Sequence, residues 1–144
     1  ILEDTLVGFR LPAFSKVMKR RLVQAPRFYY FDVGIVNHLL HRNNLVRGTA
    51  EYGHALEHLV IQELKAWLSY TDSVEQLAFW RTYSGLEVDA IVGDARLAIE
   101  INSVEEERPR IVSLDPFNRR MGNVECIHVL DFFKQLWDGA FALR

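Results

Sequence analysis

The sequence has only one cysteine, Cys126, so no disulfide can form within the chain, and a reducing compartment such as the cytoplasm fits this composition. It also has little net charge, formally -2, which gives no general attraction to nucleic acid or to an anionic membrane. No apolar run is long enough to span a membrane, and no signal peptide is visible. We therefore expect no disulfide scaffold, no membrane partner and no strongly basic nucleic-acid-binding protein.

The hydrophobic content is high enough for one packed domain. Of the 144 residues, 49% are hydrophobic and 12% aromatic, which is typical of a globular protein with a real core. The first residue is Ile1 rather than methionine, and patterned sequence begins at once. We therefore expect this chain to be a fragment of a longer protein.

The clearest element is a helix over residues 53–70, where polar and apolar stripes follow helical spacing. Asp32 stands where an N-cap would open a shorter helix. Runs of alternating aliphatic residues predict strands joined by turns at Ser84-Gly85 and Gly93-Asp94. The full expected order is an extended segment over 2–11, a helix over 13–22, a strand over 28–31, helices over 33–40 and 53–70, strands over 77–83, 87–92 and 97–102, a helix over 108–120, a strand over 124–130 and a closing helix from 131.

Three carboxylates stand apart from this apolar pattern. A period of two places Ile99 and Ile101 on one face of their strand and Glu100 on the other. Asp89 faces away from its aliphatic neighbour in the preceding strand, so we expect Asp89 and Glu100 to meet across the strand pair. Glu57 lies on the flank of the 53–70 helix beside its apolar stripe, where a carboxylate needs a partner.

The order from residue 53 onward is helix, three strands, helix, strand. A meander of three strands reaches a parallel fourth neighbour only through a crossover, and the segment over 108–120 is the only one that can provide it. The sequence therefore predicts an α/β fold with a mixed central sheet flanked by helices.

The helix with an early glutamate, the hairpin with Asp89 and the run Glu100-Ile101-Asn102 resemble the PD-(D/E)XK nuclease superfamily. This resemblance implies a restriction-endonuclease-like αβββαβ core over residues 49–144, with an N-terminal helical extension over residues 1–48. Asn102 departs from the superfamily pattern, which has a lysine at this position.

A narrower resemblance covers residues 4–130. FYYFDVGIVNHLL, YGHALEHLVIQEL, FWRTYSGLEVD and IEINS are similar to the C-terminal domain of unknown function found in bacterial and archaeal AAA-type ATPases, whose members usually read E-V-K-S where this chain reads E-I-N-S. This resemblance implies a partner, an upstream ATPase module that residues 1–48 would link to this domain. The chain has no G-x-x-x-x-G-K-[ST] loop, so we expect no ATP site in it.

The nuclease resemblance also implies a Mg²⁺ site. Asp89 and Glu100 would be direct ligands, the carbonyl of Ile101 a third contact and Glu57 a ligand through water. Asn102, at the position of the catalytic lysine, can hydrogen-bond a water but carries no charge. The loss of such a transition-state contact lowers a rate by about 100- to 1000-fold, by analogy with lost oxyanion donors. Arg81 could replace the charge, but its pairing with Glu87, Asp89 or Glu57 is favoured.

Two functions therefore stay open. The first is a weak or inactivated Mg²⁺-dependent phosphodiesterase that acts on DNA or RNA. The second is a non-catalytic module, coupled to the ATPase, that recognises a partner or nucleic acid. For the acidic residues themselves, metal binding and a buried polar network left from an ancestral nuclease are equally favoured.

Two other patterns have a structural and a functional interpretation. His54, Glu57 and His58 spell H-x-x-E-H, an inverted zinc-protease signature, but both histidines lie on the most polar stripe of their helix, so a solvated pair is favoured. The basic cluster over residues 16–21 is typical of a solvated helix face. Together with Arg108, Arg110, Arg119 and Arg120 it would alternatively contact phosphates or dock against the ATPase module.

Overall fold

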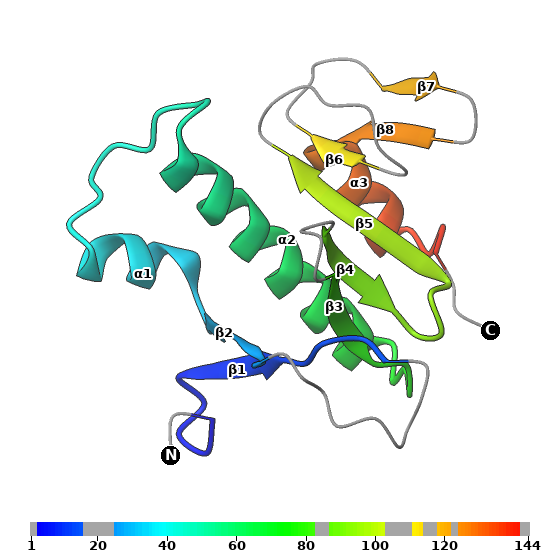
Figure 1. Cartoon of the computed structure of the whole chain (residues 1–144), viewed down its shortest axis with the longest axis horizontal. Coiled ribbons are helices and arrows are strands. Elements are labelled where there is room, and N and C mark those ends of the chain that lie inside the picture. The colour runs from blue at the N-terminus through cyan, green and yellow to red at the C-terminus, as the bar shows by residue number, and fades with distance from the viewer. Residues whose placement is uncertain are drawn as a thin grey trace.

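The computed structural model describes residues 3–15, 25–82, 87–102, 111–113, 118–121 and 124–141. Within these ranges the chain forms two β-sheets and three helices (Figure 1). The elements are β1 (Gly8–Leu11), β2 (Arg27–Tyr30), α1 (Val33–Leu39), α2 (Ala50–Tyr70), β3 (Leu77–Arg81), β4 (Glu87–Val92), β5 (Leu97–Asn102), β6 (Ile111–Ser113), β7 (Arg119–Met121), β8 (Val124–His128) and α3 (Val129–Trp137).

The larger sheet has six strands in the order β3-β4-β5-β6-β8-β7. β3, β4 and β5 form an antiparallel meander, while β6 is parallel to both β5 and β8. β7 closes the far edge antiparallel to β8. The predicted α/β fold with a mixed central sheet is therefore confirmed at this level.

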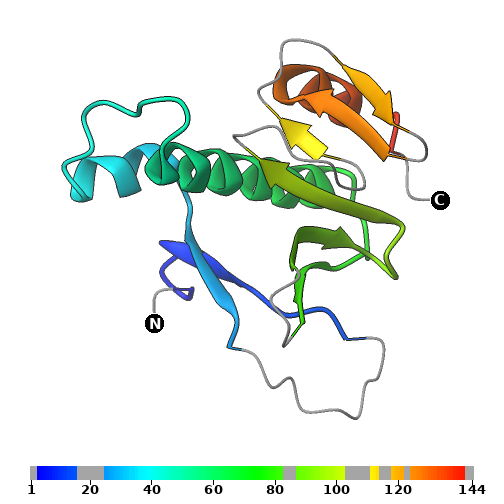
Figure 2. The same cartoon turned by 45° about the horizontal axis from the view of Figure 1, so that its top comes forward.

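The hydrophobic core lies between this sheet and the helices α2 and α3. α2 packs on β5, α3 packs on β6 and β8, and the two helices contact each other. Figure 2 shows α2 running along the sheet beside β5. The fully buried side chains at the centre include Val60 and Leu64 of α2, Ile99 of β5 and Phe132 of α3. Each such aliphatic side chain contributes roughly 1.5–3 kcal/mol through its removal from water.

The N-terminal ribbon of β1 and β2 attaches to the edge of the larger sheet. Ala13, just after β1, forms a parallel bridge with Phe79 of β3, supported by a 3.0 Å hydrogen bond from the Phe79 amide to the Pro12 carbonyl. Leu11 and Tyr29 are buried in the same core cluster as the helices and the larger sheet. The ribbon thus shares its core with the rest of the domain.

Local signals in the sequence predicted several elements correctly. The Asp32 carboxylate accepts the Ile35 amide at 2.9 Å and caps α1, as expected of an N-cap. α2 covers the whole predicted helix, and the hydroxyl of its N-cap residue Thr49 accepts a hydrogen bond from the Tyr52 amide. Gly93 opens the predicted turn between β4 and β5 with a φ of 61°, a conformation that glycine adopts without strain.

The helix predicted over residues 108–120 is wrong in its described parts, because residues 111–113 form β6 and residues 119–121 form β7. Val112 is fully buried between Ile101 of β5 and Ile127 of β8, so its environment is that of a central parallel strand. The crossover itself lies outside the described residues, as do residues 114–117 and the Ser84-Gly85 turn.

The helix predicted over residues 13–22 is wrong at its start. Ala13 takes part in the bridge to Phe79, and residues 13–15 are not helical. The rest of that segment, with the basic cluster over residues 16–21, lies outside the described residues. No helix in the described ranges is both long and apolar enough to cross a membrane.

Candidate functional site

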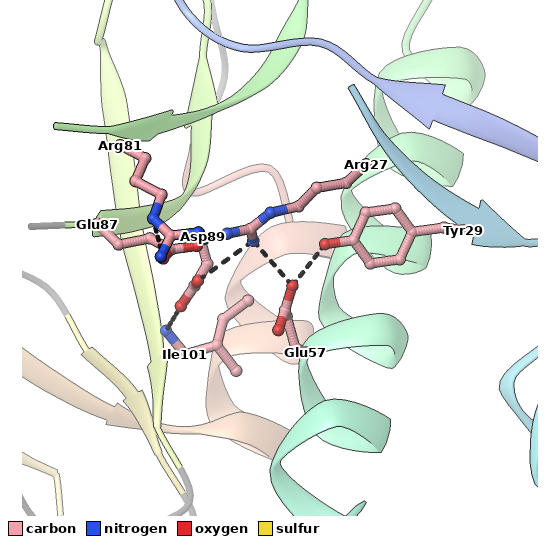
Figure 3. A network of polar contacts seen from close by, with 7 residues as sticks. All are labelled: Arg27, Tyr29, Glu57, Arg81, Glu87, Asp89 and Ile101. Carbon is pink, nitrogen blue, oxygen red and sulfur yellow. Dashed lines mark hydrogen bonds and ion pairs between the residues drawn. The ribbon is translucent and has the colours of Figure 1, made fainter. Parts of the chain in front are cut away.

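Arg27, at the start of β2, lies among three carboxylates (Figure 3). Its Nη1 atom is 3.1 Å from Glu57 Oε1 of α2 and 3.6 Å from Asp89 Oδ1 of β4. Its Nη2 atom pairs with Glu87, also of β4. One guanidinium therefore joins β2, α2 and β4, and we call this group the Arg27 network.

The Arg27 side chain is held in place by packing as well as by charge. Its guanidinium carbon lies 4.5 Å from the centroid of the Phe79 ring, in a cation–π contact. Only 24% of the side chain is exposed, so the three ion pairs are partly shielded from solvent. A planar guanidinium with several donors suits this arrangement because it can serve several carboxylates at once.

Tyr29 adds a neutral donor to the network. Its hydroxyl donates a hydrogen bond to Glu57 Oε1 at 2.5 Å, the same oxygen that Arg27 contacts. Burial raises the pKa of the Tyr29 hydroxyl well above its usual value, and the negative charge of Glu57 raises it further. Tyr29 therefore keeps its proton and acts as a hydrogen-bond donor at neutral pH.

Asp89 is the most desolvated carboxylate of the set, with 15% of its side chain exposed. Burial is the largest cause that raises its pKa, and the nearby Glu57 charge raises it further. The hydrogen bond from the Ile101 amide to Asp89 Oδ2, at 2.9 Å, and the charge of Arg27 oppose this rise without cancelling it. The unfavourable effect of burying the Asp89 carboxylate is therefore partly offset by two contacts, one on each oxygen.

Glu87 extends the network to the neighbouring strand. Its Oε2 atom lies 3.5 Å from Nε of Arg81 on β3. The pairing of Arg81 with a nearby carboxylate, favoured on sequence grounds over a catalytic role, is confirmed for Glu87. Arg81 is more exposed than Arg27, so this outer pair is more strongly screened by solvent.

The structure brings together two of the predicted site residues, Glu57 and Asp89, through Arg27. Ile101 contributes its amide N–H to Asp89, whereas the nuclease pattern would use its carbonyl as a ligand. Glu100 is half-buried in β5 between two residues of the apolar face, so it projects from the opposite face of the strand. Asn102 ends β5, where it pairs with Ser113, and its side chain lies outside the described ones.

The described side chains show no preformed site for a divalent cation. The described residues contain no group of three or more His, Cys, Asp or Glu side chains placed to hold a metal ion. The two predicted ligands that do converge, Glu57 and Asp89, converge on a guanidinium, which already supplies a positive charge. A Mg²⁺ ion at Asp89, Glu100, Ile101 and Glu57 stays a prediction.

The histidines of the H-x-x-E-H pattern differ in environment. His54 is exposed, but His58 is 7% exposed, and its Nε2 atom lies 2.7 Å from the Tyr30 carbonyl. The expectation that both are solvated is therefore wrong for His58. The cause is the N-terminal segment, which covers this stripe of α2 and also accepts a hydrogen bond from Gln62 at the Phe31 carbonyl.

Sequence reasoning missed Arg27 and Tyr29 as members of the site. Their spacing of two predicts that they share one face of a strand, which was a usable signal. Their partners on α2 and β4 lie about 30 to 60 residues away, and no local pattern indicates that β2 packs there. The site is thus made by a long-range contact that periodicity alone does not reveal.

Comparison with known proteins divides the chain into two matched segments. Residues 52–130 match a family described as a domain of unknown function (DUF4143), and residues 1–45 match a second one (DUF8612). No curated protein and no solved structure matches the chain. Arg27 and Tyr29 lie in the first segment of the sequence, and the three carboxylates lie in the second, so the Arg27 network joins the two.

Proposed function

The chain belongs to the DUF4143 family, whose match covers more than half of it, and we propose that it is a non-catalytic recognition module of an AAA-type ATPase. In this proposal the domain has a nuclease-derived, restriction-endonuclease-like core and works in the cytoplasm. The ATPase module lies upstream in the same protein, and residues 1–48 link it to the domain. Recognition of a macromolecular partner, rather than phosphodiester cleavage, is the function that the site supports best.

The observation that carries this proposal is the position of Arg27. A nuclease of this superfamily needs a divalent cation between its carboxylates, whereas here a side chain of the same protein pairs with Glu57, Glu87 and Asp89. Such a network stabilises a fold and fixes the position of a segment, and it occupies the carboxylates with a guanidinium rather than a metal ion. The uncharged Asn102 at the lysine position supports the same conclusion.

Thermal melting in the presence of Mg²⁺ or Mn²⁺ tests this proposal. A cation that binds the folded state at 100 times its Kd raises the free energy of unfolding by about 2.7 kcal/mol. We expect no such cation-dependent rise in the melting temperature of the wild-type chain. A saturable rise that Asp89→Asn abolishes would contradict the proposal.

A magnesium-dependent phosphodiesterase is the second candidate, and one observation favours it. Glu57 and Asp89 approach the same nitrogen of Arg27, at 3.1 and 3.6 Å, so two of the predicted ligands already point to one positive centre. If Arg27 were withdrawn, these carboxylates would be available to a hard cation such as Mg²⁺.

Restoration of the missing charge separates the two candidates. Three proteins are assayed for cleavage of DNA and RNA with Mg²⁺. They are the wild-type chain, the Asn102→Lys variant and the double variant Asn102→Lys with Arg27→Met. Cleavage by the double variant that Asp89→Asn removes would favour a disabled phosphodiesterase. Absence of cleavage in all variants that melt cooperatively would favour the recognition module.

A further inference from the structure

A hollow of about 430 Å³ lies beside β1 of the N-terminal ribbon. It is formed by β1, by the last turns of α2 and by the segment that leads into β3. This volume is within the range of small-molecule sites, about 300–1,000 Å³. None of the residues of the Arg27 network lines it.

Part of the lining of this hollow is apolar. Leu11 of β1 and Leu68 of α2 are buried core residues, and Leu77 at the start of β3 packs against the same core. Phe9 forms part of the wall, with its ring stacked on Tyr29 at a centroid distance of 5.8 Å. A hydrocarbon group placed here would therefore be removed from water on several sides.

Only some of the charged side chains at the rim form ion pairs. Arg10 is paired with Glu3, its Nε atom 3.1 Å from Glu3 Oε2, and Glu75 is paired with Arg96 at 3.3 Å. Lys65 has no carboxylate within ion-pair distance among the described residues, and its ammonium group lies over the Phe9 ring at 4.6 Å. The rim thus carries one uncompensated positive charge.

Hydroxyl donors stand beside this charge. Ser69 follows Lys65 by four residues in α2, so the two side chains lie on the same face of the helix, one turn apart. Ser73 accepts the Glu75 amide at 3.2 Å, which leaves its hydroxyl proton for another acceptor. An ammonium group and two hydroxyls at the edge of a partly apolar hollow are suitable donors for a carboxylate.

We propose that this hollow is a binding site for a small organic anion, a monocarboxylate with a hydrocarbon body. The carboxylate lies between Lys65 and Ser69, and the hydrocarbon body lies against Leu11, Leu68 and Leu77. Both parts of the ligand are required, because the rim alone is a solvent-exposed charge and the interior alone is a shallow apolar surface.

Titration of the ¹⁵N-labelled chain with octanoate tests this site. Three matched probes accompany it: octylamine reverses the charge, octanol removes it, and acetate removes the hydrocarbon body. We expect octanoate to shift the amide signals of Leu68, Ser69, Gln76 and Leu77 saturably. We expect at least roughly tenfold weaker binding of each matched probe, since each lacks one of the two required interactions.

Two substitutions complete the experiment. Lys65→Gln removes the exposed charge and is expected to weaken octanoate binding by roughly three- to tenfold, as for a partly exposed ion pair. Ser69→Trp fills the rim and is expected to abolish binding. Lys134→Gln removes an exposed lysine of α3, far from the lining residues in sequence, and is expected to change nothing.

Four results would overturn the proposal. The first two are the absence of any saturable shift with octanoate and saturable shifts that lie outside the lining residues. The others are equal binding of octanoate and octylamine, and unchanged octanoate affinity in Lys65→Gln. The substituted residues are exposed, so we expect each variant to fold. Cooperative melting of each variant verifies this.

Discussion

The hydroxyl of Tyr29 donates to the same oxygen of Glu57 that Arg27 contacts, at 2.5 and 3.1 Å respectively. A neutral donor and a cation from one face of β2 thus share a single carboxylate of α2. This shared acceptor fixes the N-terminal ribbon against the helix at a point where neither partner is fully exposed. The ribbon is therefore held by directed polar contacts as well as by core packing.

Tyr29→Phe removes only the hydroxyl and leaves the ring against Phe9 and His58. The lost bond has a charged acceptor, so we expect the free energy of unfolding to fall by about 1.5–3 kcal/mol. Urea unfolding at neutral pH measures this change. Tyr70→Phe, at a tyrosine that is largely exposed, serves as the control and should change stability very little.

Arg27→Met keeps an unbranched side chain over Phe79 but leaves Glu57, Glu87 and Asp89 without their shared cation. We expect a loss of about 2–3 kcal/mol, somewhat below the cost of breaking a fully buried pair because solvent reaches these groups. Arg96→Met breaks the more exposed pair with Glu75 and should cost at most about 1 kcal/mol. Equal losses in the two variants would show that the Arg27 network behaves as an ordinary surface pair.

Asp89→Asn tests the direction of the Asp89 pKa shift. Because burial raises the folded-state pKa of this carboxyl, ionisation of Asp89 lowers the stability of the wild-type chain as the pH rises from the unfolded-state value of about 3.9 through the raised folded-state value. The Asn variant has no such group. Its stability relative to wild type should therefore be more favourable at about pH 7 than at about pH 4.

Urea unfolding of both proteins across this pH interval gives the comparison. Asp94→Asn, in the exposed turn after β4, is the matched control for the removal of one carboxylate. A difference between Asp89→Asn and wild type that changes in the opposite direction with pH would mean that the charges of Arg27 outweigh the effect of burial.

Val112→Ala tests the placement of β6 in the core. Val112 has 0% exposure between two parallel neighbours, so we expect a loss of about 1.5–3 kcal/mol from the transfer of its methyl groups and the remaining cavity. Val74→Ala makes the same chemical change at a side chain that is 96% exposed, and should be nearly neutral. Similar stabilities of the two variants would contradict the central position of β6.

The parts of the fold that the sequence predicted depend on local signals. α2 is long and has helical spacing throughout, and β4 and β5 are neighbours joined by a short turn with Gly93 in the required conformation. β6 and β7 have only three residues each, so their periodicity cannot distinguish a strand from a turn of helix. Their identity comes from pairing with strands elsewhere in the chain.

The same limit applies to the candidate site. Glu57 and Asp89 were identified because carboxylates beside apolar patterns need partners, and the structure supplies such a partner in Arg27. The identity of the partner depends on how the N-terminal ribbon docks, which also buries His58. Tertiary packing, rather than local preference, decides both results.

The bridge between Ala13 and Phe79 and the Arg27 network tie the two family-matched segments at separate points. In a hybrid protein that combines residues 52–130 with an unrelated N-terminal segment, Glu57 and Asp89 would lose the positive charge of Arg27, and the edge strand β3 would lose its contact with Ala13. Such a recombinant would need a compensating arginine in the new segment. In evolution the two segments are therefore expected to change as a pair, and exchange between lineages should succeed only when both are transferred together.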